Sequence, residues 1–356
     1  MPIGGGATPQ LSCPSNPMLE RGIGLPPNYN ANAPLIETVR VSHCPVCGSD
    51  HRREYAHGFD YEIETCRNLW TFFQCTECEA VWIDPRPANG ELSTIYPPTY
   101  YAYDMSEKLP AFILKGKAML DRIKLAGITK RMGKKPTSYL DVGCGDGRYL
   151  YQFAEQGMSR DRIYGMDLPS PALPKLQSDG FRVWAGRVED CTEIEPGTID
   201  LITMFHVIEH VEDPIAVMRK LTEWLAPGGI LALETPNTDS IDRRLFSNGW
   251  WGGLHIPRHW TLFNDKSIGR AVEKAGLEPA GIFYQTGHSF WLHSFRHGLR
   301  YNTVLPMPKL AEWFNPMKSR LPLMAVTGFD LLRRTLGAKT SAMLVLARKP
   351  GGPPVA

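Results

Sequence analysis

One short segment constrains the fold of this chain more than any other: an apolar run that leads directly into a cluster of glycines. The segment spans residues 139–148 and reads YLDVGCGDGR, with glycines at positions 143, 145 and 147. The apolar run predicts a strand, and a helical pattern begins immediately after the last glycine. Glycines at such a turn let the backbone pass close to a ligand without a Cβ clash, and the first helical turn offers unpaired N–H groups. The segment therefore predicts a ligand-binding loop between a strand and a helix.

The residues around this loop alternate between short β-rich runs and helical runs. Helices are predicted over 148–156, 214–225 and 265–275, and strands over 138–142, 162–166, 182–185, 201–205, 230–233, 281–284 and 341–347. This alternation predicts a parallel sheet with crossover helices on its faces. The expected fold class is therefore α/β, with a Rossmann-like, mostly parallel sheet and helices on both faces.

Four cysteines arranged as two CxxC pairs precede the predicted sheet. Cys44 and Cys47 form the first pair, Cys75 and Cys78 form the second, and 27 residues separate the pairs. Two such turns present four thiolates to one ion, which is the usual ligand set of structural Zn²⁺. Because four protein ligands leave no open coordination position, we expect a structural zinc ribbon. A redox CxxC motif is the alternative.

The 356 residues allow about two domains, and the pattern divides them unequally. The predicted boundaries are a disordered tail at 1–35, a zinc-ribbon domain and connector at 36–105, a sheet domain at 106–350 with a helical insertion at about 291–337, and a tail at 351–356. No apolar run approaches the roughly 18 residues of a transmembrane helix. The first residues also lack the basic and apolar regions of a secretory signal. We therefore expect a cytoplasmic protein.

Several separated motifs, in this order, resemble the class I S-adenosylmethionine-dependent methyltransferases. They are the loop DVGCGDG, a strand that ends at Asp167, and residues 186–190 (GRVED), 199–214 and 225–231 (LAPGGIL). The GxGxG spacing and Asp146 at the helix start argue against a bound pyrophosphate, which a GxGxxG loop would favour. The resemblance covers about residues 139–275. Within that family, the chain resembles the ubiquinone-biosynthesis O-methyltransferases, which have Glu where this chain has His206.

The resemblance implies S-adenosylmethionine as the cofactor. Asp141 would lie near its amino group, and Asp167 would accept hydrogen bonds from its ribose hydroxyls. The resemblance implies ten cofactor-binding residues, which would contact the methionine part, the ribose, the adenine and the sulfonium. They are Asp141, Gly143, Cys144, Gly145, Asp167, Leu168, Val188, Glu189, Phe205 and His206.

Methyl transfer to a hydroxyl needs a base, and histidine is the usual choice near neutral pH. The candidates are His255 and His259, in the segment 250–263 (WWGGLHIPRHWTLF), and His206. The segment follows the end of a predicted strand, so we expect it on the ligand-facing rim of the sheet, as an exposed cover over the substrate. Arg258 would bind a phosphate or carboxylate of the acceptor. The alternative is that the segment packs on the protein itself, with His259 bonded to backbone.

The net charge of +2 conceals two basic segments. Residues 107–135 hold nine basic and two acidic residues, and residues 291–356 hold ten and two. Both are interleaved with apolar residues, which favours an anionic membrane surface, phosphorylated substrates or RNA as partners. The alternative is two ordinary helices whose apolar faces pack on the sheet.

The leading hypothesis is an enzyme that transfers a methyl group from S-adenosylmethionine to a small molecule, such as a hydroxyl of a sugar, glycolipid or related metabolite. Peripheral contact with the inner face of the membrane is a further expectation. One alternative is a C-methyltransferase of deoxysugar biosynthesis, a group that also joins a four-cysteine zinc domain to this fold. Another is an RNA methyltransferase that grips RNA with the ribbon, although the mixed charges of residues 51–78 argue against it. The non-enzymatic alternative is a module that senses the cofactor.

Overall fold

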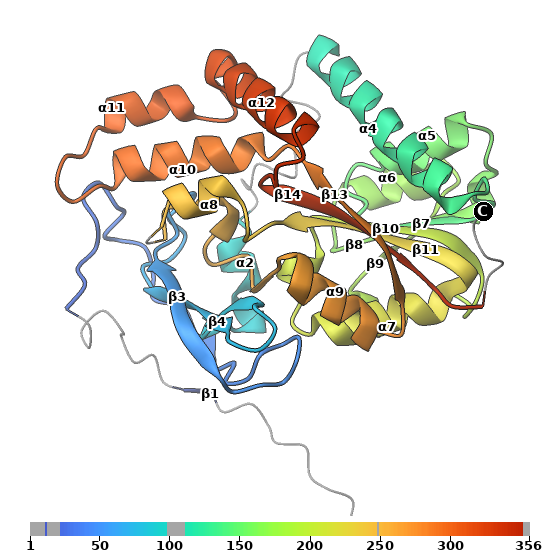
Figure 1. The fold of residues 1–356 in the computed structure, drawn as a ribbon, viewed down its shortest axis with the longest axis horizontal. Coiled ribbons are helices and arrows are strands. Elements are labelled where there is room, and N and C mark those ends of the chain that lie inside the picture. Colours follow the sequence, from blue (N-terminus) through green and yellow to red (C-terminus); the bar gives the residue numbers. More distant parts are fainter. Residues whose placement is uncertain (1–10, 13–21, 98–110, 248, 352–356) are drawn as a thin grey trace, which may run out of the picture. The chain divides into compact units, whose positions relative to one another are not determined.

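The computed structural model describes residues 11–12, 22–97, 111–247 and 249–351 (Figure 1). The chain divides into two compact units. One comprises residues 1–97, 236–264 and 284–342, and we call it the ribbon unit. The other comprises residues 98–235, 265–283 and 343–356, and we call it the sheet unit. Much of the predicted N-terminal tail, and nearly all of the predicted C-terminal tail, lies outside the described residues.

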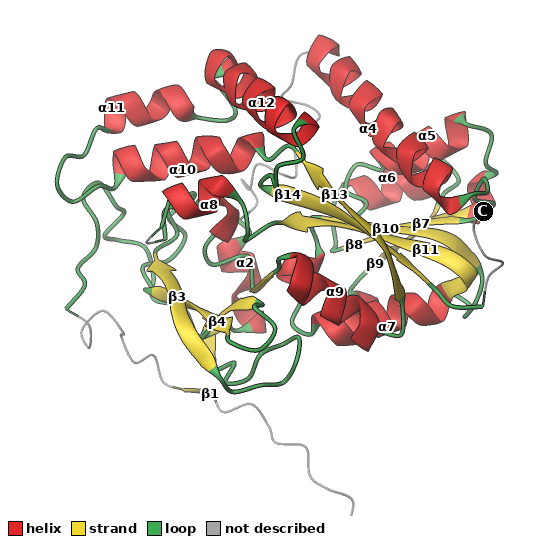
Figure 2. Ribbon diagram, in the orientation of Figure 1, coloured by secondary structure: helices red, strands yellow, loops and turns green. Residues whose placement is uncertain are grey.

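The sheet unit is built on a seven-stranded sheet with helices against it (Figure 2). In spatial order the strands are β13 (Glu278–Gln285), β14 (Ala342–Arg348), β11 (Leu225–Pro236), β10 (Ile199–Phe205), β7 (Tyr139–Val142), β8 (Ile163–Asp167) and β9 (Arg182–Ala185). The pairs formed among β11, β10, β7, β8 and β9 are parallel. The predicted α/β fold with a mostly parallel sheet is confirmed.

The helices of this unit alternate with its strands, as the sequence pattern predicts. They are α4 (Ala111–Met132), α5 (Arg148–Glu155), α6 (Ala172–Ser178), α7 (Pro214–Trp224) and α9 (Asp265–Lys274), with short 3₁₀ turns at Arg160–Arg162, Val188–Asp190 and Ile208–His210. Local chemistry sets their ends. For example, the Asp213 side chain accepts hydrogen bonds from the N–H groups of Ile215 and Ala216, and Pro214 occupies the first helical position of α7.

The order of the strands locates the ligand-binding edge of this sheet. From β7 the chain moves outward through β8 to β9, and then returns to place β10 on the other side of β7. In open α/β sheets, ligands bind beyond the carboxyl ends of the strands where the order reverses. The glycine loop that follows β7 and the residues that follow β10 therefore lie at the expected binding edge.

The ribbon unit contains two small sheets. The larger has the order β12 (Thr261–Leu262), β5 (Val81–Ile83), β4 (Trp70–Cys75) and β3 (Arg52–Gly58), and all its pairs are antiparallel. The smaller joins β1 (Leu11–Ser12), β2 (Thr38–Val39) and β6 (Arg86–Pro87). The helices of this unit are α2 (Leu92–Ile95), α8 (Ile241–Leu245), α10 (His288–Arg300), α11 (Pro308–Ala311) and α12 (Arg320–Thr335), with 3₁₀ turns at Asn89–Glu91, Gly252–Leu254 and Glu312–Phe314.

Two stretches of chain fold with the ribbon although the sequence pattern placed them with the large sheet. Residues 236–264 and 284–342 belong to the ribbon unit. The reason is apolar packing, because Trp251, Leu254 and Trp260 are buried in the same core as Trp70 and Phe72 of the ribbon strands. The helical character expected at about 291–337 is present as α10, α11 and α12.

Part of the predicted disordered tail is also ordered. Residues 22–35 are described, and Tyr29 is buried against Phe59 and Tyr301, with its hydroxyl donating to the backbone oxygen of Cys66 at 2.5 Å. The prediction of disorder is therefore wrong for residues 22–35, because one aromatic side chain anchors this polar stretch in the ribbon core.

Among the described residues, no helix combines the length and apolar character needed to span a bilayer.

Candidate functional site

The glycine loop has the backbone geometry that its sequence predicts. Gly143, Gly145 and Gly147 have φ angles of +79°, +53° and +78°, a region that favours glycine. A Cβ on Gly143 would lie 2.3 Å from Cγ2 of Val207, and one on Gly147 would lie 2.3 Å from Cδ2 of Leu176. A Cβ on Gly145 would meet no described atom within 4 Å. The outer two glycines are therefore needed for packing, and the middle one faces open space.

Asp167 joins the end of β8 to this loop. Its Oδ2 accepts a hydrogen bond from the N–H of Gly145 at 2.6 Å, and its Oδ1 accepts one from the N–H of Leu168 at 2.7 Å. Burial raises the pKa of this carboxyl group, although the two hydrogen bonds oppose the shift. The structure thus brings Asp167, Gly145 and Leu168 together at the binding edge, as the sequence predicts.

Asp141 lies inside β7 and is only 2% exposed. Its Oδ1 accepts a hydrogen bond from the Thr203 hydroxyl at 2.7 Å, and the Tyr139 hydroxyl in turn lies 2.6 Å from the oxygen of Thr203. Its other oxygen, Oδ2, is buried and has no hydrogen-bond partner among the residues that the structure describes. Burial raises the pKa of this group to about 7. A buried acceptor without a partner is costly, so this oxygen is suited to a ligand that brings a donor, above all a cationic one.

The remaining predicted cofactor residues lie after the neighbouring strands. Val188 is buried in a 3₁₀ turn after β9, and Glu189 pairs with Arg187 at 3.2 Å. Phe205 ends β10, and its ring packs edge-on against Tyr149 at a centroid distance of 5.2 Å. Cys144 is buried behind the loop. Asp141 thus lies within β7, and every other residue of the predicted cofactor set ends or follows β7, β8, β9 or β10.

His206, directly after β10, is held by two carboxylates. Its Nδ1 lies 3.2 Å from Oε1 of Glu209 and its Nε2 lies 3.5 Å from Oε1 of Glu234, and its φ angle is +56°. Burial alone would lower the pKa of His206, but the bonds to the two carboxylates outweigh it and raise the pKa to about 9. The imidazole is therefore protonated at neutral pH, and this arrangement does not support the role of base predicted for it.

Lys124 extends this cluster. It comes from α4, and its Nζ lies 2.5 Å from Oε2 of Glu234 and 4.7 Å from the ring centroid of Phe205. Burial alone would raise the pKa of Glu234, but Lys124 and His206 outweigh it and hold the pKa well below its usual range. Two cations thus enclose one buried carboxylate beside the ends of β10 and β11. The sequence motifs gave no sign of Lys124 or Glu234, because neither belongs to the glycine loop or to a histidine cluster.

The segment 250–263 is buried, which corrects the prediction that it forms an exposed cover. Thr261 and Leu262 form β12 and pair with β5 of the ribbon. Trp251 is 1% exposed and donates through Nε1 to Oδ2 of Asp242 at 2.6 Å. The three tryptophans of the segment therefore pack on the ribbon unit itself, the alternative that its composition had left open.

The surroundings of Arg258 contradict its predicted role in binding the acceptor. It is 0% exposed, and its two terminal nitrogens bond to the two oxygens of Asp60 at 3.0 and 2.9 Å. Its Nε also donates to the backbone oxygen of Ile95 at 2.8 Å. The prediction that Arg258 binds a phosphate or carboxylate of the acceptor is wrong, because a two-pronged buried ion pair within the ribbon unit uses this guanidinium.

The two predicted bases of the segment have different surroundings. Nδ1 of His259 lies 2.8 Å from the backbone oxygen of Gly253. Nδ1 of His255 lies 2.5 Å from Oε2 of Glu62, and Nε2 of His293 lies 3.4 Å from the other oxygen of the same carboxylate. Burial alone would raise the pKa of Glu62, but the facing histidines hold it well below its usual range. His255 is also in the left-handed region, with a φ angle of +38°. Sequence reasoning missed Glu62, which lies 193 residues from its partner.

The four cysteines of the two CxxC pairs come together. Their sulfur atoms all lie within 4.8 Å of one another, with Cys44 Sγ 3.5 Å from Cys78 Sγ and Cys47 Sγ 3.5 Å from Cys75 Sγ. Zinc–sulfur bonds of about 2.3 Å in a tetrahedron place the sulfurs roughly 3.8 Å apart. The cluster therefore fits a single tetrahedral zinc ion.

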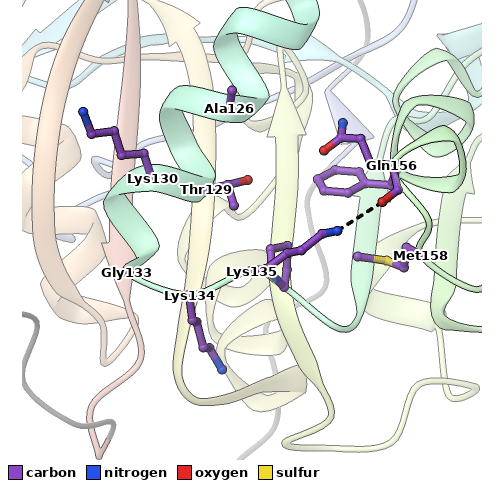
Figure 3. A pocket seen from close by; sticks show the side chains of 10 residues that line it. Ala126, Thr129, Lys130, Gly133, Lys134, Lys135, Gln156 and Met158 are labelled. Carbon is purple, nitrogen blue, oxygen red and sulfur yellow. Dashed lines mark hydrogen bonds between the residues drawn. The ribbon is translucent and has the colours of Figure 1, made fainter.

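A pocket of about 510 Å³ lies in the sheet unit, at the end of the sheet opposite to the glycine loop. It is lined by the end of α4, the residues that lead into β7, and the end of α5 (Figure 3). Lys135 donates to the backbone oxygen of Gln156 at 3.1 Å, and Lys134 pairs with Asp200 at 2.6 Å. This pocket is at the amino end of β7, away from the glycine loop, so it is not the cofactor site.

Comparison with known proteins agrees with this geometry. Residues 115–280 match the family model described as a methyltransferase domain. The ubiquinone biosynthesis O-methyltransferases of Xanthomonas campestris pv. campestris and Xanthomonas euvesicatoria pv. vesicatoria are 34% identical to this chain over 127 and 128 residues, which is 33% of this chain and 51% of each relative. The chain thus spans about half the length of the curated relatives it matches. Residues 115–280 are thus similar to methyltransferase domains, and the resemblance drawn from the motifs to the class I S-adenosylmethionine-dependent methyltransferases is confirmed.

A solved structure is similar over more of the chain. The 1,6-didemethyltoxoflavin-N1-methyltransferase of Burkholderia thailandensis, with bound 1,6-didemethyltoxoflavin and S-adenosylhomocysteine, aligns with 78% of this chain and 98% of its own. The TM-score is 0.44 and the sequence identity is 16%.

Proposed function

We propose that this protein is an enzyme that transfers a methyl group from S-adenosylmethionine to a small-molecule acceptor. The observation that carries the proposal is the buried Oδ2 of Asp141, which has no partner among the described residues and lies at the base of a loop of positive-φ glycines. The methionine end of the cofactor carries an ammonium group, which would supply the missing donor. The domain match and the O-methyltransferase names of the relatives support the same conclusion.

The bound cofactor supplies a methyl group on a positively charged sulfur. The task of the protein is to align the acceptor and, for a hydroxyl, to take up its proton. Asp141 would bind the ammonium group once its own carboxyl is ionised, and Asp167, already fixed by two backbone N–H groups, would bind the ribose hydroxyls. Val188 and Glu189 would contact adenine, and Phe205 would border the sulfonium.

For the acceptor we propose a hydroxyl of a sugar, glycolipid or related metabolite, and for the base His255, with His259 as the second candidate. The reason for preferring His255 is the short contact between its Nδ1 and the Glu62 carboxylate. If Nδ1 carries the proton, Glu62 would accept its hydrogen bond and the basic lone pair would lie on Nε2. Glu62 would then act as a positioning residue that stabilises the protonated imidazole. Peripheral contact with an anionic membrane completes the proposal.

The experiment is transfer of a tritiated methyl group from S-adenosylmethionine to fractions of a host lysate, together with calorimetric measurement of cofactor binding. We expect label in small organic molecules, and its loss in Asp167→Ala. The matched control is Asp161→Asn, an exposed carboxylate of the sheet unit, which should leave both measurements unchanged. Label confined to RNA or protein would contradict the proposed acceptor class, and absence of cofactor binding would contradict the function as a whole.

We also propose that the four-cysteine cluster holds one structural zinc ion. The fit of the sulfur distances to a tetrahedral site supports it. Metal analysis of the purified protein should give one zinc per chain, and Cys75→Ser should lower this value towards zero. Cys191→Ser, which changes a buried cysteine of the sheet unit, should retain the metal. A chain that is folded and free of zinc would refute this assignment.

A further inference from the structure

Helix α12 presents apolar side chains to its outer surface. Of its 16 residues, all of them described, only Pro322 and Asp330 are buried. Leu321, Met324 and Leu332 are 72%, 70% and 59% exposed, and Leu336, directly after the helix, is 76% exposed. Positions 321, 324, 325, 328, 332 and 336 follow the three- and four-residue spacing of one helical face. A surface helix normally turns such a face towards the core, so the outward stripe requires a separate explanation.

The segment before α12 also exposes apolar side chains. Val304, Leu305 and Trp313 are 89%, 64% and 56% exposed. The turn that contains Trp313 packs beside α12, and both α11 and α12 pack beside α10 in the same unit (Figure 1). We call residues 304–336 the outer helix surface. Monomeric proteins rarely expose a large contiguous apolar surface unless it contacts a partner.

The charge on the outer helix surface is positive. Residues 304–336 contain five basic residues and two acidic ones. Both acidic side chains are paired: Glu312 lies 3.1 Å from Arg296, and Asp330 is buried and lies 3.1 Å from Arg333. The exposed basic residues of this surface are Lys309, Lys318, Arg320 and Arg334. The exposed side chains of this surface therefore carry an excess of positive charge.

We propose that the outer helix surface docks on an anionic lipid bilayer, with α12 in the plane of the interface. Its leucine and methionine stripe would enter the boundary of the acyl chains, and the lysines and arginines around it would face lipid phosphates. A second copy of this chain is a poorer occupant, because a symmetric contact would bring two cationic surfaces together. Single-stranded RNA would use the charge and stack on aromatic rings such as Trp313, but the stripe along α12 at positions 321, 324, 332 and 336 is aliphatic and offers no such ring.

The test is flotation of the full chain with vesicles of phosphatidylcholine alone or phosphatidylcholine mixed with phosphatidylglycerol, without cofactor. We expect binding to the mixed vesicles that weakens with salt, and little binding to the neutral ones. The variant Leu321→Gln/Met324→Gln should bind mixed vesicles about tenfold more weakly. The matched control is Ile241→Gln/Leu245→Gln, which changes two side chains of α8 in the same unit that are 42% and 64% exposed. The control should bind like the wild type.

A charge variant separates the two contributions. Lys309→Gln/Lys318→Gln/Arg334→Gln should retain weak, salt-insensitive binding, because the apolar stripe remains. Equal binding to neutral and mixed vesicles would overturn the proposal, as would unchanged binding of the stripe variant. Dimerisation without lipid that Leu321→Gln/Met324→Gln abolishes would assign the surface to a second copy instead. This inference rests on the membrane contact in the proposed function, and failure of the test would overturn that contact. Because no cofactor is present, the failure would leave the proposed methyl transfer standing.

Discussion

The glycine loop and the segment 250–263 are the two segments that the sequence singles out as candidate sites, and their polar groups differ in how many of them are paired within the chain. At the loop, Asp141 keeps a buried oxygen without a partner among the described residues, and Gly145 faces open space. In the segment, Arg258 is bonded to both oxygens of Asp60, and Trp251 is bonded to Asp242. The loop thus keeps binding capacity for something outside the chain, whereas much of the segment's capacity is used within the ribbon unit.

The difference shows how to separate a ligand site from a structural network when both are rich in polar groups. Folded proteins rarely leave buried polar groups unpaired, because the lost hydration is not recovered. Such a group points to a ligand where the neighbouring backbone is also open, as it is at Gly145. Lack of a partner alone is not enough, because Nε1 of Trp260 in the segment is also buried without a partner among the described residues. His255 has features of both a ligand site and a structural network, because Glu62 fixes its Nδ1 while its backbone is held at a φ angle of +38°.

The largest expected effect is on the buried ion pair of the segment. Asp60→Asn should lower the free energy of unfolding by about 3–5 kcal/mol, because it leaves the Arg258 guanidinium buried without its counter-charge. Urea denaturation measures this loss. The control is Arg244→Gln in the exposed pair Arg244–Asp239, whose side chains are 73% and 30% exposed. Arg244→Gln should lower the free energy of unfolding by no more than about 1 kcal/mol. If the two variants lost similar amounts, the buried ion pair would be no more important to stability than the exposed one.

The second prediction concerns two glycines of the loop. Gly143→Ala should cost about 2–3 kcal/mol of stability and abolish measurable cofactor binding, because its new Cβ would meet Val207 in a backbone conformation that already disfavours alanine. Gly145→Ala has the same backbone cost without the clash, so its loss should be about 1 kcal/mol. Thermal unfolding and calorimetric titration distinguish the two. A Gly143→Ala protein that binds cofactor normally would contradict the proposed position of the loop.

The third prediction is a pH dependence caused by Asp141. Because burial raises its pKa to about 7, the folded protein holds a proton that the unfolded chain has released. Stability should therefore fall as the pH rises from about 4 to about 7, and Asp141→Asn should flatten this slope. Cofactor affinity should rise over the same range as the carboxylate forms. An affinity that is independent of pH in the wild type would show that Asp141 does not bind the ammonium group.

The smallest effect is expected at His206, whose imidazole is 43% exposed. Its pKa of about 9 lies above that of the unfolded chain, so its contribution to stability is fully present below about pH 6.5 and is lost as the pH rises through about 9. The stability difference between wild type and His206→Gln should shrink over that range. Titration of the imidazole by NMR gives a second measurement, and a midpoint near 6.5 would mean that Glu209 and Glu234 do not hold the ring as described. His51→Gln, which changes an exposed histidine, is the control.

Much of the sheet unit could be predicted from sequence because its signals are local. The strand at 182–185 has the bounds expected, and the glycine loop lies between β7 and α5 as the apolar run and the glycines require. Asp167 reaches the loop because adjacent parallel strands end at one edge of a sheet. The four cysteines could be expected to come together for a similar reason, because each CxxC pair lies within one short turn.

The sequence alone therefore determined the sheet, the cofactor loop and the cysteine cluster, whose signals are encoded in spacing over a few residues. The tertiary structure decided where the other chemistry belongs. Asp60 and Arg258 are 198 residues apart, and Glu62 and His255 are 193 apart. No local pattern links such pairs, since burial in a shared core brings them together. For the same reason only the folded chain shows that the Asp141 oxygen lacks a described partner and that the apolar face of α12 points outward.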